Sequence, residues 1–475
     1  MTSHQGGACG SRAAPEVFPV YGRLVRCSVW ILIALAAAAT AHANGRPPQT
    51  NGVFVRPGDL QATYVRTTFG LLISHDDCTY RWVCEQNIGY GGQFDPKYAI
   101  ATDGTIFATT YDGLRVSRDG GCTFTTATSD LPSNDPNRIA DVWVDAIDIA
   151  SDGAIWVATA DSGHANDVFV SRDNGATFRP TGMQSPQIWW KSIRVAPTDP
   201  QKIYVTGYQV AGTMPDGGQM SPTAHLVRST DGGVSWREAP LGGVSFGQQA
   251  VSYVMAVSPT EPDTIIYVSE YANPPMGDRI YRSTDGGQTL VEVLATTTRV
   301  RDVVFLDALT VVVAMGPADS AISKNAGQSF EPLGTWVDPQ NNAPQLACLG
   351  KRGGELFGCG ANWTPDFKAL AKSGDGAHWN KVTRFVEIAG PIECPDGTPN
   401  KMLCDPIWFG PTGLQVQFGT TGPVCSAPIL DQTPNPVSAP SGGCCEAGGT
   451  PASSGILGLM VFGVVRLRRR SRYSR

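Results

Sequence analysis

Short segments of alternating apolar and polar residues recur along most of the chain, and this pattern is typical of half-buried strands. Ile193 and Val195, for example, alternate with Ser192 and Arg194. Two consecutive stretches repeat three such segments in the same order: KSIRVAP, TDPQKIYVTGY and AHLVRST, then SYVMAVSP, TEPDTIIYVSEY and DRIYRST. Each stretch therefore predicts an apolar strand, a turn containing proline, a second strand, a loop and a third strand.

The third strand of each stretch leads into a short motif that is repeated through the chain. The four fullest copies are SRDGGCTF, SRDNGATF, STDGGVSW and STDGGQTL, and weaker copies begin at Ser74, Ser323 and Ser373. Serine and aspartate side chains close such a turn by hydrogen bonding to nearby backbone amides, while glycine supplies a positive φ. The residues expected to hold the four full turns are Ser117, Asp119, Gly121, Ser171, Asp173, Gly175, Ser229, Asp231, Gly233, Ser283, Asp285 and Gly287.

These copies resemble the Asp-box, or bacterial neuraminidase repeat, over nearly all of residues 54–384. The resemblance implies an all-β fold, a seven-bladed β-propeller of four-stranded antiparallel blades, since four strands in roughly 40–58 residues make one blade. The first unit lacks an evident opening strand, whereas KMLCDPIWFG at 401–410 offers strand material after the last copy. We therefore expect N- and C-terminal strands to close the ring together.

Composition agrees with many short strands and argues against two kinds of partner. The 475 residues include 54 glycines and 35 prolines, and only 16% of them are charged. A formal net charge of −6 provides no basic surface for nucleic acid. The cysteines lack paired Cys-x-x-Cys spacing, so we expect no metal and no cofactor.

Both ends of the chain have the composition of targeting segments. In residues 1–43, Arg23 and Arg26 precede an apolar stretch and a small-x-small cleavage site, which predicts a signal peptide. The propeller is expected over residues 44–425, and a linker rich in Pro, Ser and Gly over 426–443. Residues 444–475 then form a separate C-terminal tail.

This tail resembles the C-terminal sorting tail of myxobacterial surface proteins. Its apolar run, 455–465, is too short to span a bilayer, which needs about 20 residues. The resemblance implies cleavage near the cysteines and membrane association through lipid on Cys444 or Cys445. We therefore expect an exported protein at the bacterial cell surface or outer membrane, or released from it. A degenerate helix with chance arginines is the alternative.

Export would place the remaining cysteines in an oxidising compartment, where an even number predicts disulfides. Eight of the twelve remain once the two ends are set aside. Two pairs flank short turns and are candidates for local disulfides: Cys348 with Cys359, and Cys394 with Cys404. The other four are candidates for pairing among themselves, but the sequence does not fix how: Cys78, Cys84, Cys122 and Cys425.

The uneven loops indicate that a ligand would bind on the face opposite the repeated turns. Loops between second and third strands emerge there, and the longest are 207–224 and 270–278. Aromatic residues in such loops and in the links between blades suit stacking on a sugar or contact with a peptide. The candidates are Trp189, Trp190, Tyr208, Tyr271 and Trp363, with Tyr111 on the same face. Packing at a strand start is the alternative for Trp189 and Trp190.

Catalytic motifs find little support in the residues. The early sialidase motif is only approximated by 54–57, where Arg56 is shifted by one place, and xyloglucan-type glycosidases carry a catalytic carboxylate where this chain has Thr68. Gly243 to Gly247 fits a G-x-S-x-G elbow without its strand-turn-helix setting. We therefore assign no catalytic residue. We expect a monomeric, surface-displayed module that binds a glycan or an extracellular protein, with an exo-sialidase-like or other glycoside hydrolase as the alternative.

Overall fold

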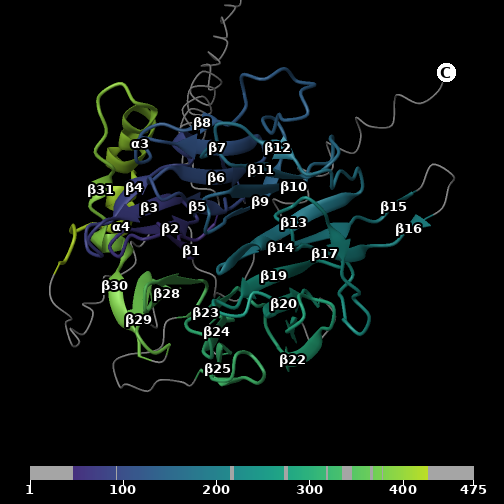
Figure 1. Cartoon of the computed structure of the whole chain (residues 1–475). Coiled ribbons are helices and arrows are strands. Elements are labelled where there is room, and N and C mark those ends of the chain that lie inside the picture. Colours follow the sequence, from purple (N-terminus) through teal and green to yellow (C-terminus); the bar gives the residue numbers. More distant parts are fainter. Residues whose placement is uncertain are drawn as a thin grey trace, which may run out of the picture.

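The computed structural model describes residues 46–425, apart from 93, 214–218, 272–276, 317–318, 334–344, 364–366 and 377. Within them, seven small antiparallel sheets of four strands each form a ring, and one sheet carries an additional strand (Figure 1). The predicted all-β, seven-bladed β-propeller is confirmed. The predicted signal peptide, linker and tail, with Cys444 and Cys445, lie outside the described residues.

Each blade takes its strands from consecutive segments of the chain. In order, the blades contain β1 (Thr50–Val55), β2 (Thr63–Thr67), β3 (Gly70–Ser74) and β4 (Arg81–Val83); β5 (Tyr98–Ile100), β6 (Ile106–Thr110), β7 (Gly113–Ser117) and β8 (Thr125–Thr126); β9 (Val144–Ile149), β10 (Ile155–Thr159), β11 (Val168–Ser171) and β12 (Arg179–Pro180); β13 (Ile188–Ala196), β14 (Asp199–Gln209), β17 (Thr223–Ser229) and β18 (Arg237–Glu238); β19 (Ser252–Val257), β20 (Ile265–Ser269), β21 (Arg279–Ser283) and β22 (Val291–Ala295); β23 (Asp302–Phe305), β24 (Val311–Ala314), β25 (Ala321–Ser323) and β26 (Glu331–Pro332); β27 (Leu349–Arg352), β28 (Glu355–Cys359), β29 (Leu370–Ser373) and β30 (Asn380–Thr383). A two-stranded hairpin, β15 (Gly212–Thr213) and β16 (Gln219–Met220), projects from the fourth blade (Figure 1).

The first strand of every blade lies innermost and contacts the first strands of both neighbouring blades. The contact between β27 and β1 completes this inner ring. Apolar side chains fill the spaces between blades, because seven core clusters each combine residues of two neighbouring blades. Backbone amides are also bonded across the blades: Asp148 accepts the Val195 N–H at 2.8 Å, and Asp302 accepts the Leu349 N–H at 3.0 Å.

The ends of the chain meet at the first blade, but not in the predicted way. That blade has its own opening strand, β1, and the C-terminal strand β31 (Gly390–Pro391) is an added outer strand parallel to β4. The segment KMLCDPIWFG was wrongly predicted as a strand, since it lies in the helix α3 (Pro399–Phe409). Proline suits the first helical position. The buried side chains of α3 recur at helical spacing, at Asn400, Cys404 and Trp408.

Residues 385–425 form what we call the C-terminal cap, which covers the outer side of the first blade (Figure 1). It contains η2 (Phe385–Glu387), β31, α3 and α4 (Leu414–Phe418); a further short helix, α2 (Glu85–Ile88), follows β4. Aromatic rings join the cap to the blade: Trp408 lies 5.4 Å from Trp82, and Phe418 lies 5.1 Å from Phe69, centroid to centroid. The cap therefore extends the apolar core of the ring beyond its outer strands.

Four disulfides form among the described residues, and three of them tie the cap to the first two blades: Cys78–Cys425, Cys84–Cys404 and Cys122–Cys394. The local pair Cys348–Cys359 is present as predicted. The predicted pair Cys394–Cys404 is wrong, because α3 turns Cys404 inward toward Cys84 while Cys394 follows β31 on an extended segment. Four disulfides in one chain indicate an oxidising, extracellular-type environment.

The repeated motif forms the turn between the third and fourth strands of each blade. In the second blade, Ser117 Oγ donates to Asp119 Oδ1 and accepts the Gly121 N–H, both at 2.8 Å, and Asp119 accepts the Thr123 N–H at 2.9 Å. Equivalent serine bonds form at Ser171, Ser229 and Ser283 and in the three weaker copies. In the fourth blade, hydrogen bonds from the Ser235 side chain and backbone lower the pKa of Asp231 to about 2. These serines and aspartates are thus occupied within their own turns.

Candidate functional site

The blades give the ring two different faces. The repeated turns and the loops between first and second strands lie on one face, which we call the turn face. The loops between second and third strands and the links between blades lie on the opposite face, which we call the loop face. Trp189 near the start of β13 and Tyr208 near the end of β14 therefore lie on the loop face.

Five aromatic rings meet on the loop face, and we call them the aromatic cluster: Phe94, Tyr111, Trp143, Trp189 and Tyr208. Trp143 is central, because its ring centroid lies 4.9 Å from that of Tyr111 and 5.6 Å from that of Trp189. Tyr208 lies 6.1 Å from Trp189, and Phe94 lies 4.5 Å from Tyr111. The cluster joins segments of the second, third and fourth blades.

The members of the aromatic cluster are exposed to different degrees. Tyr111 is 52% exposed, Trp143, Trp189 and Tyr208 are half-buried, and Phe94 is buried beneath them. The rings are tilted or edge-on to one another, with interplanar angles of 46–80°. Each ring thus packs against its neighbours. Tyr111 and the outer parts of the three half-buried rings offer apolar surface to a ligand.

Trp190 must be removed from the candidates, because it is only 3% exposed and packs in the core between the third and fourth blades. Adjacent strand residues point to opposite sides, so Trp189 and Trp190 cannot both face a ligand. The pairing of β13 with β14 also shifts register between Trp190 and Ser192, which leaves Lys191 in a bulge. Bulges often redirect a side chain, and here the result is a lysine beside the aromatic cluster.

Lys191 joins the aromatic cluster to a buried ion pair. Its Nζ lies 5.2 Å from the Trp143 ring centroid and forms a salt bridge with Asp145. Lys97 Nζ donates to the Lys191 carbonyl at 2.8 Å and lies 3.5 Å from Asp145 Oδ1. Burial lowers the pKa of Lys97 to about 8. Lys191 is therefore held by contacts on several sides before any ligand arrives.

A second charged group lies beside the first. Tyr253 donates its hydroxyl to Glu270 at 3.1 Å, and Arg299 lies 2.7 Å from the same carboxylate and 3.4 Å from Asp278. Burial raises the pKa of Tyr253 well above its ordinary value, which keeps the hydroxyl protonated as a donor. Lys191 and Tyr208 both interact electrostatically with Glu270. The loop face thus combines rings, donors and acceptors in one region.

The other predicted aromatic residues lie outside the aromatic cluster. Tyr271 follows β20 and stacks with Arg279, whose guanidinium carbon is 4.8 Å from the ring centroid. Trp363 follows β28 in the seventh blade, and its ring centroid lies 6.3 Å from that of Phe385 in the C-terminal cap. Sequence reasoning missed Phe94, Trp143 and Lys191, since links between blades and a strand bulge give no periodic pattern.

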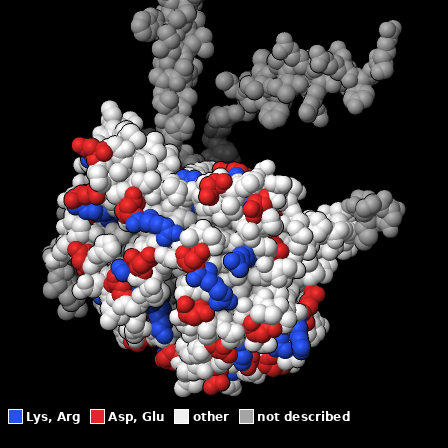
Figure 2. Space-filling view, turned by 45° about the horizontal axis from the view of Figure 1, so that its top comes forward, with Lys and Arg blue, Asp and Glu red and all other residues white. Residues whose placement is uncertain are grey.

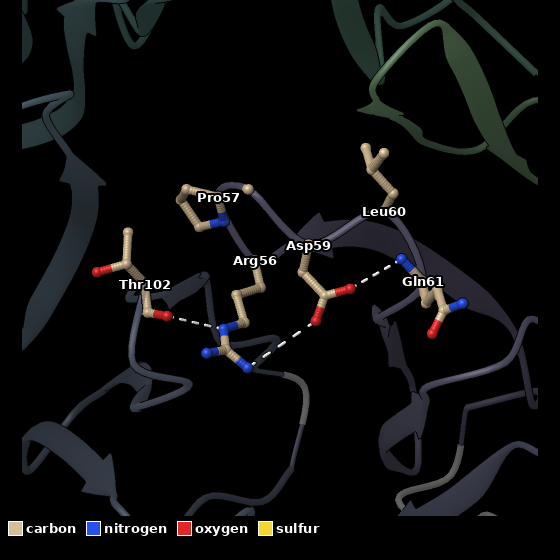
Figure 3. Close-up of a pocket in the computed structure, with 7 residues that line it drawn as sticks. Arg56, Pro57, Asp59, Leu60, Gln61 and Thr102 are labelled. Carbon is tan, nitrogen blue, oxygen red and sulfur yellow. Dashed lines mark hydrogen bonds and ion pairs between the residues drawn. The ribbon is translucent and has the colours of Figure 1, made fainter.

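The early motif 54–57 lies on the turn face, away from the aromatic cluster. Its Arg56 donates through Nε to the Thr102 carbonyl at 2.8 Å and lies 3.9 Å from Asp59 (Figure 3). Arg56 lines an open hollow of about 580 Å³ together with Asp59, Gln61 and Thr102 (Figure 3).

Thr68 is buried, and its hydroxyl donates to the Pro47 carbonyl at 2.9 Å. Neither Arg56 nor Thr68 contributes to the region around Lys191.

Acidic and basic side chains are interspersed across the face seen in Figure 2, and neither kind forms a large patch there. Among the described residues, no group of three or more His, Cys, Asp or Glu side chains is placed to hold a metal ion. No helix within the described part of the chain is both long and apolar enough to cross a membrane.

Neither a protein-family model nor a curated protein matches the sequence. Several solved structures match parts of the chain at low sequence identity. A protein of unknown function from Dyadobacter fermentans is 16% identical, with a TM-score of 0.38, and the match covers 60% of this chain and 93% of that one. YCF48 from Cyanidioschyzon merolae is 11% identical, with a TM-score of 0.42 and coverage of 66% and 92%. A GH74 enzyme from Niastella koreensis is 12% identical, with a TM-score of 0.27 and coverage of 71% and 72%.

Proposed function

We propose that this protein is an Asp-box β-propeller of the bacterial cell surface that binds a glycan or protein ligand through the aromatic cluster. A glycan is the ligand class that the chemistry favours. The observation that carries the proposal is the contact of Trp143 with Tyr111, Trp189 and Lys191 on the loop face.

The geometry of this region suits a sugar chain. Sugar rings present C–H faces that pack on aromatic rings, and hydroxyl edges that need donors and acceptors. The aromatic cluster supplies the rings, while Lys191, Glu270 and Arg299 supply charged groups that are each partly exposed. Because these groups are already paired, little side-chain entropy is lost on binding.

The cell-surface part of the proposal rests on the ends of the chain. The signal peptide predicted at 1–43 and the lipid attachment predicted at Cys444 or Cys445 would export the propeller and retain it outside the cell. The disulfides of the described residues agree with that compartment. The Asp-box serines and aspartates serve the turns in this proposal and take no part in binding.

Binding to a glycan array, followed by titration calorimetry with a glycan that binds, tests the proposal. Trp189→Ala and Tyr208→Ala should each weaken binding about tenfold, which corresponds to about 1.4 kcal/mol. Trp363→Ala is the matched control, since it removes an aromatic ring from the same face outside the aromatic cluster. If all three variants bind like the wild type, the aromatic cluster is not the site. Binding to a peptide library alone would identify the ligand as a protein.

Glycoside hydrolysis is the second candidate, and it is motivated by the two carboxylates beside Lys191. Asp145 and Glu270 could act as a pair of the kind that glycosidases use. Both are bound to cations, however, Asp145 to two lysines and Glu270 to Arg299, which favours binding over proton transfer. Release of product from a panel of fluorogenic glycosides, abolished by Asp145→Asn or Glu270→Gln, would support hydrolysis instead.

A further inference from the structure

Helix α3 of the C-terminal cap is apolar on two opposite sides. One side, at Asn400, Cys404 and Trp408, is buried against the first blade. The opposite side carries Met402 and Phe409, each 59% exposed, seven residues apart and therefore on one side of the helix. Leu403, at 43% exposed, and Pro406 border them, and we call these four residues the outer stripe.

The outer stripe is unusual for a helix on the surface of a domain, where the outward side is normally polar. The only charged side chains of α3 are Lys401 and Asp405, and they neutralise each other in a salt bridge of 2.9 Å. A helix that is apolar on both sides is normally covered on both. The structure covers only the inner side of α3.

Exposed apolar side chains are concentrated in the C-terminal cap. Among the described residues, eleven large apolar side chains are exposed, and five of them belong to the cap: Met402, Leu403, Phe409, Val416 and Val424. Single exposed apolar residues are normal, but their accumulation in one region marks an interaction surface. The cap is therefore the part of the described surface with the strongest reason to have a partner.

The size of the outer stripe helps to select the partner. Four half-exposed side chains offer on the order of 400 Å², whereas a stable protein–protein interface buries about 800 Å² on each side. A second copy of this chain would therefore gain too little area. A lipid surface has no such minimum, because it accepts a short apolar stripe without shape complementarity.

The course of the chain supports the same partner. The Cys78–Cys425 disulfide fixes the end of the cap to the first blade, which is the blade that the cap covers. The residues that follow Cys425 include Cys444 and Cys445, where the resemblance of the tail to sorting tails implies an attached lipid. A tether of this kind raises the local concentration of the membrane at the cap. We propose that the outer stripe of α3 rests on a lipid surface.

This contact is separate from the proposed ligand site, so each can fail without the other. The test uses the full chain with vesicles of phosphatidylethanolamine and phosphatidylglycerol, and it measures hydrogen exchange of residues 399–410. The wild type should show vesicle-dependent protection there. In the double variant Met402→Asp/Phe409→Asp that protection should be lost, and vesicle flotation should fall at least tenfold.

The matched control is Val234→Asp/Leu309→Asp, which places the same charges at exposed apolar positions outside the cap, 83% and 60% exposed. It should bind vesicles like the wild type. Intact disulfides and an unchanged urea unfolding midpoint would show that the α3 variant is folded. Protection of α3 without vesicles would mean that the chain's own tail or a second copy covers the outer stripe, and would overturn the proposal. Equal vesicle binding of both double variants would overturn it as well.

Discussion

Removing the Cys84–Cys404 disulfide should cost less stability than its position in the sequence implies. The perturbation is Cys84→Ala/Cys404→Ala, which removes the bond that ties α3 to the end of β4 and places no polar group in the buried site. Taken alone, this bond closes a loop between residues 320 apart. The chain-entropy relation then predicts a loss of about 6 kcal/mol in the free energy of unfolding.

The neighbouring disulfide reduces that value. With Cys78–Cys425 intact, the unfolded chain is already joined 6 residues before Cys84 and 21 residues after Cys404. The bond then closes a loop of only about 27 residues, for which the same relation gives about 3–4 kcal/mol. Cys348–Cys359, with a separation of 11, gives about 3 kcal/mol. The two disulfides should therefore contribute nearly equally.

Urea unfolding without reductant, followed by tryptophan fluorescence, measures both effects. The control is Cys348→Ala/Cys359→Ala, which removes a disulfide whose loop is short in any background. A loss near 6 kcal/mol for the first variant would show that the other two disulfides do not restrain its unfolded state. A loss below about 1 kcal/mol would show that the bond does not constrain the unfolded chain at all.

Two further predictions concern the turns and the loop face. Gly233→Ala should destabilise the fold by about 1–3 kcal/mol more than Gly243→Ala. Both glycines have a positive φ, 84° at Gly233 and 86° at Gly243. A Cβ added at Gly233 would lie 2.4 Å from the Trp156 ring, whereas a Cβ added at Gly243 would have no atom within 4 Å. Equal urea midpoints of the two variants would contradict this reasoning. Burial lowers the pKa of Lys97 to about 8, so the folded state favours the neutral form of this side chain. The free energy of unfolding of the wild type, compared with that of Lys97→Met, should therefore rise as the pH increases from about 8 to 10.5. Asp145, Lys191 and Arg194 remain in both proteins, and a difference in unfolding free energy that does not change with pH would refute the assignment.

The parts of the fold that depend on neighbouring residues could be predicted from the sequence. Each repeated turn closes through bonds between residues two to four apart, so its hydrogen bonding is contained in the motif itself. The number of blades followed from counting the copies. Helix α3 was missed because its apolar run Met402–Cys404 also fits a short strand. Burial of Asn400 and Trp408 against the first blade decides for the helix.

The candidate site was predicted only in part, because its members meet through the closure of the ring. Trp189 and Tyr208 pair directly across β13 and β14, a local relation. Phe94 and Trp143 come from links between other blades and reach Trp189 only in the folded ring. The bulge that separates Trp190 from Lys191 is set by the pairing of β13 with β14, which no single strand specifies. The long-range disulfides depend on the same closure.

The Cys78–Cys425 disulfide also determines how the molecule would bear mechanical load. A pull on the chain beyond residue 425 passes through this bond into the turn between β3 and β4. Residues 385–424 of the C-terminal cap lie off that shortest covalent path, so their packing bears less of the force. A stretched tether would therefore load the first blade and leave the aromatic cluster undistorted.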